Sequence, residues 1–161
     1  MIDFTQQQAR INWRISNDDV MGGESQGNIL FERDYGVFTG NISLANNGGF
    51  SAAFTAVQPL SQEVRAVTID IAGDGNRYQL RIITYDNGES TYYFHEFNTV
   101  TGQRQKLRFA LADFQATFRG RQIANAPTLK AEVVGEVGFL LTTKEAGEFS
   151  LSVFAIDFIN A

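Results

Sequence analysis

Hydrophobic and polar residues alternate along most of the chain with a period of two. In residues 77–85, for example, Tyr78, Leu80 and Ile82 alternate with Gln79 and Arg81. Such alternation is typical of β-strands with one face buried and the other in contact with water or a neighbouring element. The pattern predicts roughly nine or ten strands, near residues 28–33, 35–44, 50–57, 64–71, 77–85, 90–97, 105–110, 133–142 and 148–158.

Glycine and asparagine mark the turns between these runs. The sequence "DNG" at 86–88 predicts a hairpin, because Asn-Gly tolerates the positive φ angles of tight turns. Helix is expected only as a turn or two near residues 5–10 and at 111–114. Many short strands with little helix predict an all-β fold, an antiparallel β-sandwich of the jelly-roll type, in a single domain over residues 1–161.

Composition narrows the function classes. The chain has 161 residues, with 13 basic and 18 acidic side chains and a net charge of −5, which argues against non-specific nucleic-acid binding. It has no cysteine and one histidine, so no thiolate nucleophile or Cys- or His-rich metal site is expected, and no cofactor. No apolar run is long enough to span a membrane, and "MIDFTQQQARINW" lacks the pattern of a secretory signal. A cytoplasmic location is therefore predicted.

Two sequence features suggest catalysis only superficially. "GESQG" at 23–27 matches the nucleophile elbow G-x-S-x-G with Ser25 as nucleophile, but that motif needs a strand before the serine and a helix after it, whereas here a strand-like run follows. Asp18 and Asp19 are adjacent, so in an extended segment they point to opposite sides and are poorly placed to share one reacting atom. A turn-capping role is favoured for one of them. The chain is predicted not to be an enzyme; a hydrolase centred on Ser25 or on paired carboxylates is the disfavoured alternative.

One strand region combines aromatic and polar residues in a way that could bind a ligand. In "TYYFHEF" at 91–97, alternate residues fall on opposite faces. Gln79, Arg81, Tyr93 and His95 are the predicted ligand-binding side chains of a polar–aromatic sheet face for a sugar or peptide. The favoured alternative is that His95 is a cross-strand partner or a surface residue.

Two further groups of residues are weaker candidates. Arg119 and Arg121 in "FRGRQ" could bind an anion or a partner's carboxylate, although exposed loop arginines more often have no specific role. Asp74 in "GDGN", or Asp18, could contribute to a structural calcium site, but the EF-hand spacing is not met and a turn between strands is the favoured interpretation.

Five segments occur in an order that resembles the complex I intermediate-associated protein 30 family. They are "NDDVMGGESQG" (17–27), "FTGNISLANNGGFSAAF" (38–54), "GDGNRYQLRI" (73–82), "FQATFRGR" (114–121) and "VGFLLTTKEAGEFSLSVFAIDF" (137–158). The resemblance runs from about Trp13 to Phe158. It implies a galactose-binding-like jelly roll. It also implies relatives that look like assembly chaperones for the respiratory NADH:ubiquinone oxidoreductase in mitochondria, and bacterial relatives with no agreed activity.

The resemblance directs attention to two loops as binding or structural candidates, with the structural role favoured. Their residues are Asp18, Asp19, Met21, Gly22, Gly23, Ser25, Asn47, Gly48, Gly49 and Phe50. We expect the first loop to pack beside the second at one end of the sandwich. The predicted function is a non-catalytic protein-binding or assembly-factor-like module, and the alternative is a module that binds carbohydrate or another small ligand.

Overall fold

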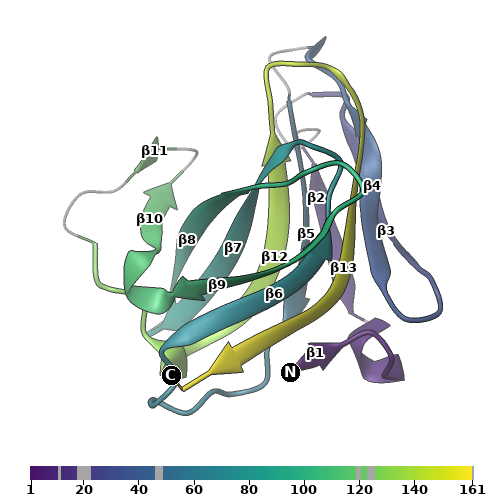
Figure 1. Cartoon of the computed structure of the whole chain (residues 1–161). Helices are drawn as coiled ribbons and strands as arrows, with labels where there is room; N and C mark the ends of the chain where they lie inside the picture. Colours follow the sequence, from purple (N-terminus) through teal and green to yellow (C-terminus); the bar gives the residue numbers. More distant parts are fainter. Residues whose placement is uncertain (11, 18–22, 46–48, 119–120, 123–125, 161) are drawn as a thin grey trace.

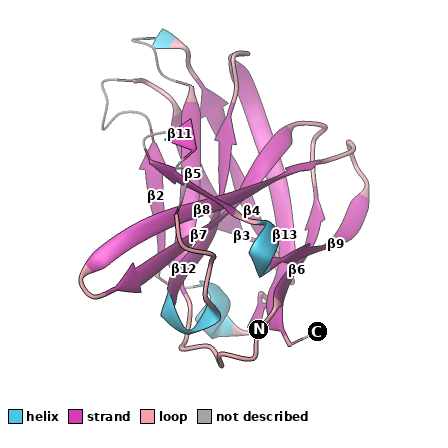
Figure 2. Ribbon diagram, turned by 90° about the vertical axis from the view of Figure 1, so that its left-hand side faces the viewer, coloured by secondary structure: helices cyan, strands magenta, loops and turns pink. Residues whose placement is uncertain are grey.

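The computed structural model describes residues 1–10, 12–17, 23–45, 49–118, 121–122 and 126–160. This part of the chain forms two antiparallel β-sheets that face each other, and its helical content is confined to short 3₁₀ turns (Figures 1 and 2). The predicted all-β sandwich is confirmed. The termini lie at the same end, where β1 (Ile2–Asp3) pairs with the last strand. No helix among the described residues is long and apolar enough to cross a membrane.

Each sheet is assembled from strands that lie far apart in the sequence. Sheet A contains, in spatial order, β3 (Gln26–Phe31), β4 (Gly36–Ile42), β13 (Gly147–Ile159), β6 (Ala66–Ala72) and β9 (Arg104–Ala110), with β1 also paired to β13. Sheet B contains β11 (Arg121–Gln122), β10 (Gln115–Phe118), β8 (Glu89–Asn98), β7 (Arg77–Asp86), β12 (Val134–Thr142), β5 (Phe50–Ala56) and β2 (Trp13–Asn17). The 3₁₀ turns are η1 (Gln7–Arg10), η4 (Leu111–Asp113) and η5 (Ala131–Val133).

All nine runs predicted from the alternation are strands, and their ends differ from the prediction by only a few residues. The hairpin at "DNG" is confirmed: Asp86 pairs with Glu89, and the two turn residues Asn87 and Gly88 have φ angles of 53° and 80°. Four strands were not predicted: β1, β2, β10 and β11. β1 and β11 have two residues each, too few for an alternation to be recognised. β2 and β10 have five and four residues and do alternate, with Trp13 and Ile15 in β2 and Ala116 and Phe118 in β10, but these short runs were overlooked.

The main core lies between the sheets and follows directly from the alternation. On β7, the side chains of Tyr78, Leu80 and Ile82 point inward and are fully buried. From the opposite sheet they meet the inward residues of β6, including Ile69 and Ile71. The intervening residues of β7 therefore point away from sheet A, onto the outer face of sheet B.

Candidate binding face on sheet B

The outer face of sheet B brings together side chains from six strands. The strand registers place one row of residues side by side across the sheet: Arg14, Phe54, Gly138, Arg81, Phe94 and Gln115. Figure 2 shows the central strands β8, β7 and β12 of this sheet running next to one another. We call this side, which points away from sheet A, the outer face.

A small apolar cluster forms the floor of the outer face. Ala52, Phe54, Ile83 and Leu140 pack together there, separately from the main core, and each is at most 8% exposed. Phe50 is partly buried against them. Sheet B is therefore apolar on both sides at its centre, which explains why Ile82 and Ile83 are adjacent in sequence and both buried.

Aromatic side chains stand beside this floor and remain accessible. Tyr85 is 51% exposed and Tyr92 is 43% exposed. Phe94, the neighbour of Arg81 in the row, is half-buried. Large aromatic side chains exposed next to an apolar cluster are typical of surfaces that bind a partner or ligand.

A charged network occupies the β2 side of the outer face. Arg14 Nε donates to Glu136 Oε1 at 2.8 Å, Arg14 Nη2 donates to Oε2 at 3.3 Å, and the Tyr85 hydroxyl also donates to Oε2. The guanidinium of Arg14 lies over the Phe54 ring, 4.6 Å from its centroid. Partial burial by itself would raise the pKa of Glu136, but the hydrogen bonds from Arg14 and Tyr85 outweigh it and lower that pKa. The hydrogen bond to Glu136, together with burial, raises the pKa of Tyr85 to about 12.

The lowered pKa of Glu136 makes stability depend on pH in a defined direction. Because the folded pKa lies below the ordinary value of 4.5, the contribution is complete above pH 4.5 and is lost as pH falls through the folded pKa. We expect Glu136→Gln to cost about 1 kcal/mol at neutral pH, and the difference from the unchanged chain to shrink at pH 3 to 4. Urea unfolding at neutral pH and at pH 3 to 4 measures the free energy of unfolding of both proteins. Glu132→Gln, at an exposed position, is the control; an equal loss for Glu136→Gln at both pH values would contradict the expectation.

Arg81 occupies the centre of the outer face. Its Nε donates to Gln79 Oε1 at 2.9 Å, and its guanidinium carbon lies 5.9 Å from the centroid of the Phe94 ring. Burial lowers the pKa of Arg81. Nearer the start of β7 on the same face, Arg77 Nε lies 3.0 Å from Glu96 Oε2. Gln79 and Arg81 are both half-buried on the outer face of sheet B.

The predicted partners of Gln79 and Arg81 lie on the opposite side of the sheet. Tyr93 is 3% exposed and its hydroxyl donates to the Pro127 carbonyl oxygen at 2.8 Å. The His95 ring packs between the sheets, with its centroid 4.6 Å from that of Phe109. The prediction that these four residues share one face is therefore wrong, because cross-strand neighbours point to the same side and those neighbours are Glu96 for Gln79 and Phe94 for Arg81.

The signal that could have prevented this error was present in the sequence. In a two-residue hairpin the residue numbers of each cross-strand pair have a constant sum, and the "DNG" turn sets that sum by pairing Asp86 with Glu89. The same sum pairs Arg81 with Phe94 and Ile83 with Tyr92. The contact between Arg14 and Glu136 had no comparable signal, because it depends on β2 and β12 both pairing with β5, which no local pattern specifies.

Most of the loop candidates lie outside the described residues: Asp18, Asp19, Met21, Gly22, Asn47, Gly48 and Arg119. The expected packing of the two loops against each other stays a prediction for the same reason. Arg121 lies on β11, paired with Phe118. Gly23 is buried, Gly49 accepts a hydrogen bond from the Thr143 backbone N–H at 3.1 Å, and Phe50 packs on the apolar floor.

Ser25 is engaged with the backbone of a neighbouring segment. It is 2% exposed, and its hydroxyl donates to the Ser43 carbonyl oxygen at 3.0 Å and accepts from the Ser43 N–H at 2.9 Å. These two bonds join the residues just before β3 to those just after β4. The geometry gives Ser25 a structural role in this hairpin.

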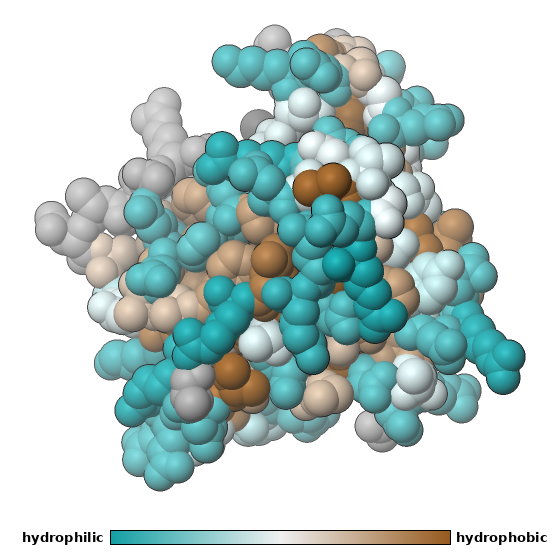
Figure 3. Space-filling model, in the orientation of Figure 1, coloured by the Kyte–Doolittle hydropathy of each residue, from teal (hydrophilic) through white to brown (hydrophobic). Residues whose placement is uncertain are grey.

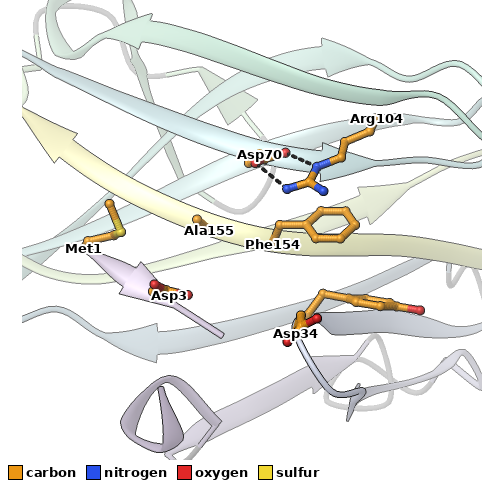
Figure 4. A pocket seen from close by; sticks show the side chains of 8 residues that line it. Met1, Asp3, Asp34, Asp70, Arg104, Phe154 and Ala155 are labelled. Carbon is orange, nitrogen blue, oxygen red and sulfur yellow. Dashed lines mark hydrogen bonds and ion pairs between the residues drawn. The ribbon is translucent and has the colours of Figure 1, made fainter. Parts of the chain in front are cut away.

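An open hollow of about 420 Å³ lies on the outer face of sheet A (Figure 4). Its central groups are already engaged with one another: Arg104 donates to both carboxylate oxygens of Asp70 at 2.9 Å and stacks on Phe154, with its guanidinium carbon 3.8 Å from the ring centroid. Asp3 accepts hydrogen bonds from the backbone N–H and hydroxyl of Thr5.

The face of the molecule seen in Figure 3 is largely hydrophilic, with only scattered hydrophobic areas. We therefore take the outer face of sheet B as the candidate site.

Comparisons with solved structures identify the fold. The chain is similar to the family 11 carbohydrate-binding module of the cellulosomal cellulase Lic26A-Cel5E of Clostridium thermocellum, with a TM-score of 0.70, 12% identity, and coverage of 94% of this chain and 89% of that chain. The same kind of module in complex with a β-1,3-1,4-mixed-linked tetrasaccharide gives a TM-score of 0.69, 13% identity, and coverage of 94% and 90%. A family 28 module specific for non-crystalline cellulose gives a TM-score of 0.55, 11% identity, and coverage of 100% and 95%. At these identities the likeness establishes a shared β-sandwich fold.

Comparisons at the level of sequence identify the family. A search of curated proteins finds no match. The sequence model of the family described as "Complex I intermediate-associated protein 30" matches residues 2–153, which is nearly the whole chain. The resemblance found in the five segments is thereby confirmed, and the chain belongs to the complex I intermediate-associated protein 30 family.

Proposed function

We propose that the chain is a non-catalytic protein-binding module of the assembly-factor type, which holds its partner on the outer face of sheet B. The observation that carries this proposal is the pair of exposed tyrosines, Tyr85 and Tyr92, beside half-buried Phe94 and Arg81 on one continuous face. Tyrosine and arginine are enriched among the residues that dominate protein–protein binding energies. The family also supports a protein-binding function, because its name describes association with an intermediate of complex I, which is a protein assembly.

A carbohydrate-binding module is the second candidate function. It is favoured by one specific observation: the exposed Tyr92 ring lies on the same face as the planar polar groups of Gln79, Arg81 and Glu96. Rings beside such groups could stack on and hydrogen-bond a sugar. The structural neighbour named with a mixed-linked tetrasaccharide supports this by analogy of fold alone.

Site-specific photo-crosslinking tests the first proposal. A photoreactive phenylalanine analogue replaces Tyr92 in the protein expressed in its own host, and cross-linked species are identified by mass spectrometry. The matched control carries the same analogue at Leu30, which is 49% exposed on β3 of the other sheet. We expect one discrete protein to cross-link from position 92 and not from position 30. Phe94→Ala is expected to reduce the yield about tenfold or more, as for loss of a central contact residue.

Two other outcomes would count against the proposal. Equal labelling from positions 92 and 30 would show that the outer face of sheet B is not a specific docking surface. Absence of a cross-linked protein, together with retarded electrophoresis in gels that contain soluble mixed-linked β-glucan, would assign the face to carbohydrate. Loss of that retardation in Phe94→Ala would then locate the sugar on the same residues.

A further inference from the structure

Of the arginine side chains that the structure describes on the outer face of sheet B, Arg81 is the one that forms no ion pair with a described carboxylate. Among the residues that the structure describes, Arg14 pairs with Glu136 and Arg77 pairs with Glu96, while the side-chain hydrogen bond of Arg81 is to the neutral amide of Gln79. No carboxylate of the described residues lies within ion-pair distance of the Arg81 guanidinium. The two ion pairs cancel in charge, so among the described side chains of this face the charge of Arg81 remains unbalanced, in a chain whose net charge is −5.

The Arg81 guanidinium is held in position rather than free to move in solvent. Its Nε is bonded to Gln79 Oε1, which leaves the two terminal nitrogens available as donors. The Phe94 ring lies on one side of it. A guanidinium fixed in this way loses little conformational entropy when it forms two parallel hydrogen bonds to a carboxylate.

The partial burial of Arg81 also needs an explanation. A half-buried cation loses part of its hydration, which normally requires an anionic partner as compensation. Burial lowers the pKa of Arg81, which is the signature of such uncompensated desolvation. An anion supplied by a binding partner would provide the missing compensation and would also be guided to this point by the charge.

We propose that Arg81 is the anchor of the binding face and takes up a carboxylate of the partner protein, from an aspartate or glutamate side chain, through its two terminal nitrogens. This inference rests on the proposed protein-binding function. It extends that function by naming the chemistry of the contact: the partner presents an acidic residue to Arg81. Tyr92 pairs with Ile83, two residues from Arg81 on β7, and its ring is exposed. The Tyr92 ring would therefore contact the partner next to the carboxylate that binds Arg81.

Nuclear magnetic resonance of the arginine Nε–H groups tests the anchor directly. The probes are blocked glutamate (N-acetyl-glutamate N-methylamide) and blocked glutamine as its neutral match, with galacturonate and galactose as the sugar pair. We expect blocked glutamate to shift the Arg81 Nε–H signal in a saturable manner in the millimolar range, and blocked glutamine to leave it unchanged. Arg77→Gln, on the same face, is expected to retain the shift of Arg81.

Three results would overturn the inference. No saturable shift with either carboxylate probe would remove Arg81 as an anion site. A shift of equal size with blocked glutamine would show that charge is not recognised. Affinity at least tenfold higher for galacturonate than for blocked glutamate would assign the site to an acidic sugar.

The cross-linking experiment separates failure of this inference from failure of the proposed function. With the photoreactive group at position 92, Arg81→Gln is expected to reduce the yield of cross-linked partner at least tenfold. Arg77→Gln is expected to leave that yield unchanged. If Arg81→Gln keeps the partner at full yield, the anchor is wrong and the binding function stands. If the protein that retains Arg81 and carries the photoreactive group at position 92 also cross-links to no partner, the proposed binding function itself fails.

Discussion

Gly138→Ala is expected to destabilise the sandwich by about 3 kcal/mol or more, because the sheet leaves no room for a side chain at this position. A Cβ atom on Gly138 would lie 2.0 Å from the backbone oxygen of Ala53 and 2.7 Å from Cδ1 of Phe54. Both belong to β5, which is directly paired with β12. The nearer atom is backbone, so no side-chain rotation relieves the clash and the two strands must move apart.

The change would also alter the binding face, since Gly138 lies between Phe54 and Arg81 in the central row. Thermal and urea unfolding measure the effect, and a loss of about 3 kcal/mol corresponds to a fall in Tm of roughly 6–12 °C for a chain of this size. Gly102→Ala is the matched control: its φ of 73° is strained for alanine, but no atom lies within 4 Å. That control should cost only about 1 kcal/mol. If Gly138→Ala cost no more than Gly102→Ala, the steric explanation would be wrong.

Asp74→Ala is expected to cost about 3 kcal/mol, because one carboxylate holds the turn between β6 and β7 and also bridges the two sheets. Its Oδ1 accepts from the Tyr78 hydroxyl at 3.0 Å and from the Asn76 N–H at 3.1 Å. Its Oδ2 accepts from Asn76 Nδ2 at 3.0 Å and from the Ser150 N–H at 2.8 Å. These four bonds engage both carboxylate oxygens, so the turn role that was favoured over a calcium site is the one the geometry shows.

The largest part of this cost comes from Tyr78. Tyr78 is fully buried. Burial and the nearby charge of Asp74 both raise the pKa of the Tyr78 hydroxyl, so the hydroxyl stays protonated and acts as a hydrogen-bond donor. Removing the carboxylate leaves that donor buried without its partner, which is more costly than removing both groups together.

A double-mutant cycle in urea measures the coupling. Tyr78→Phe in the Asp74→Ala background should recover part of the stability, and Asp74→Asn, which retains an acceptor, should cost less than Asp74→Ala. Asp113→Ala, at an exposed position of η4, controls for loss of an aspartate as such. Strict additivity of Asp74→Ala and Tyr78→Phe would show that the buried hydrogen bond is not the source of the cost.

Local features of the sequence were sufficient for the nine longer strands. The alternation in 77–85 predicted both the strand and the inward direction of Tyr78, Leu80 and Ile82, because a strand turns successive side chains to opposite faces whatever its neighbours are. The "DNG" turn predicted its hairpin because few residue pairs tolerate two positive φ angles. Both signals depend only on interactions between residues close in sequence.

The binding face depends on pairings that no local pattern specifies. Arg14 meets Glu136 across 122 positions of sequence because β2 and β12 both pair with β5. Gly138 must be glycine because β5 lies beside it, and Arg81 has no carboxylate partner among the described residues because its row brings it Phe94 instead. The sequence by itself determined the nine longer strands, the "DNG" hairpin and the inward side of a strand such as 77–85, since steric periodicity acts within a few residues. Only the tertiary structure decided which strands are neighbours and in what register, because that choice is made by packing the whole sandwich at once.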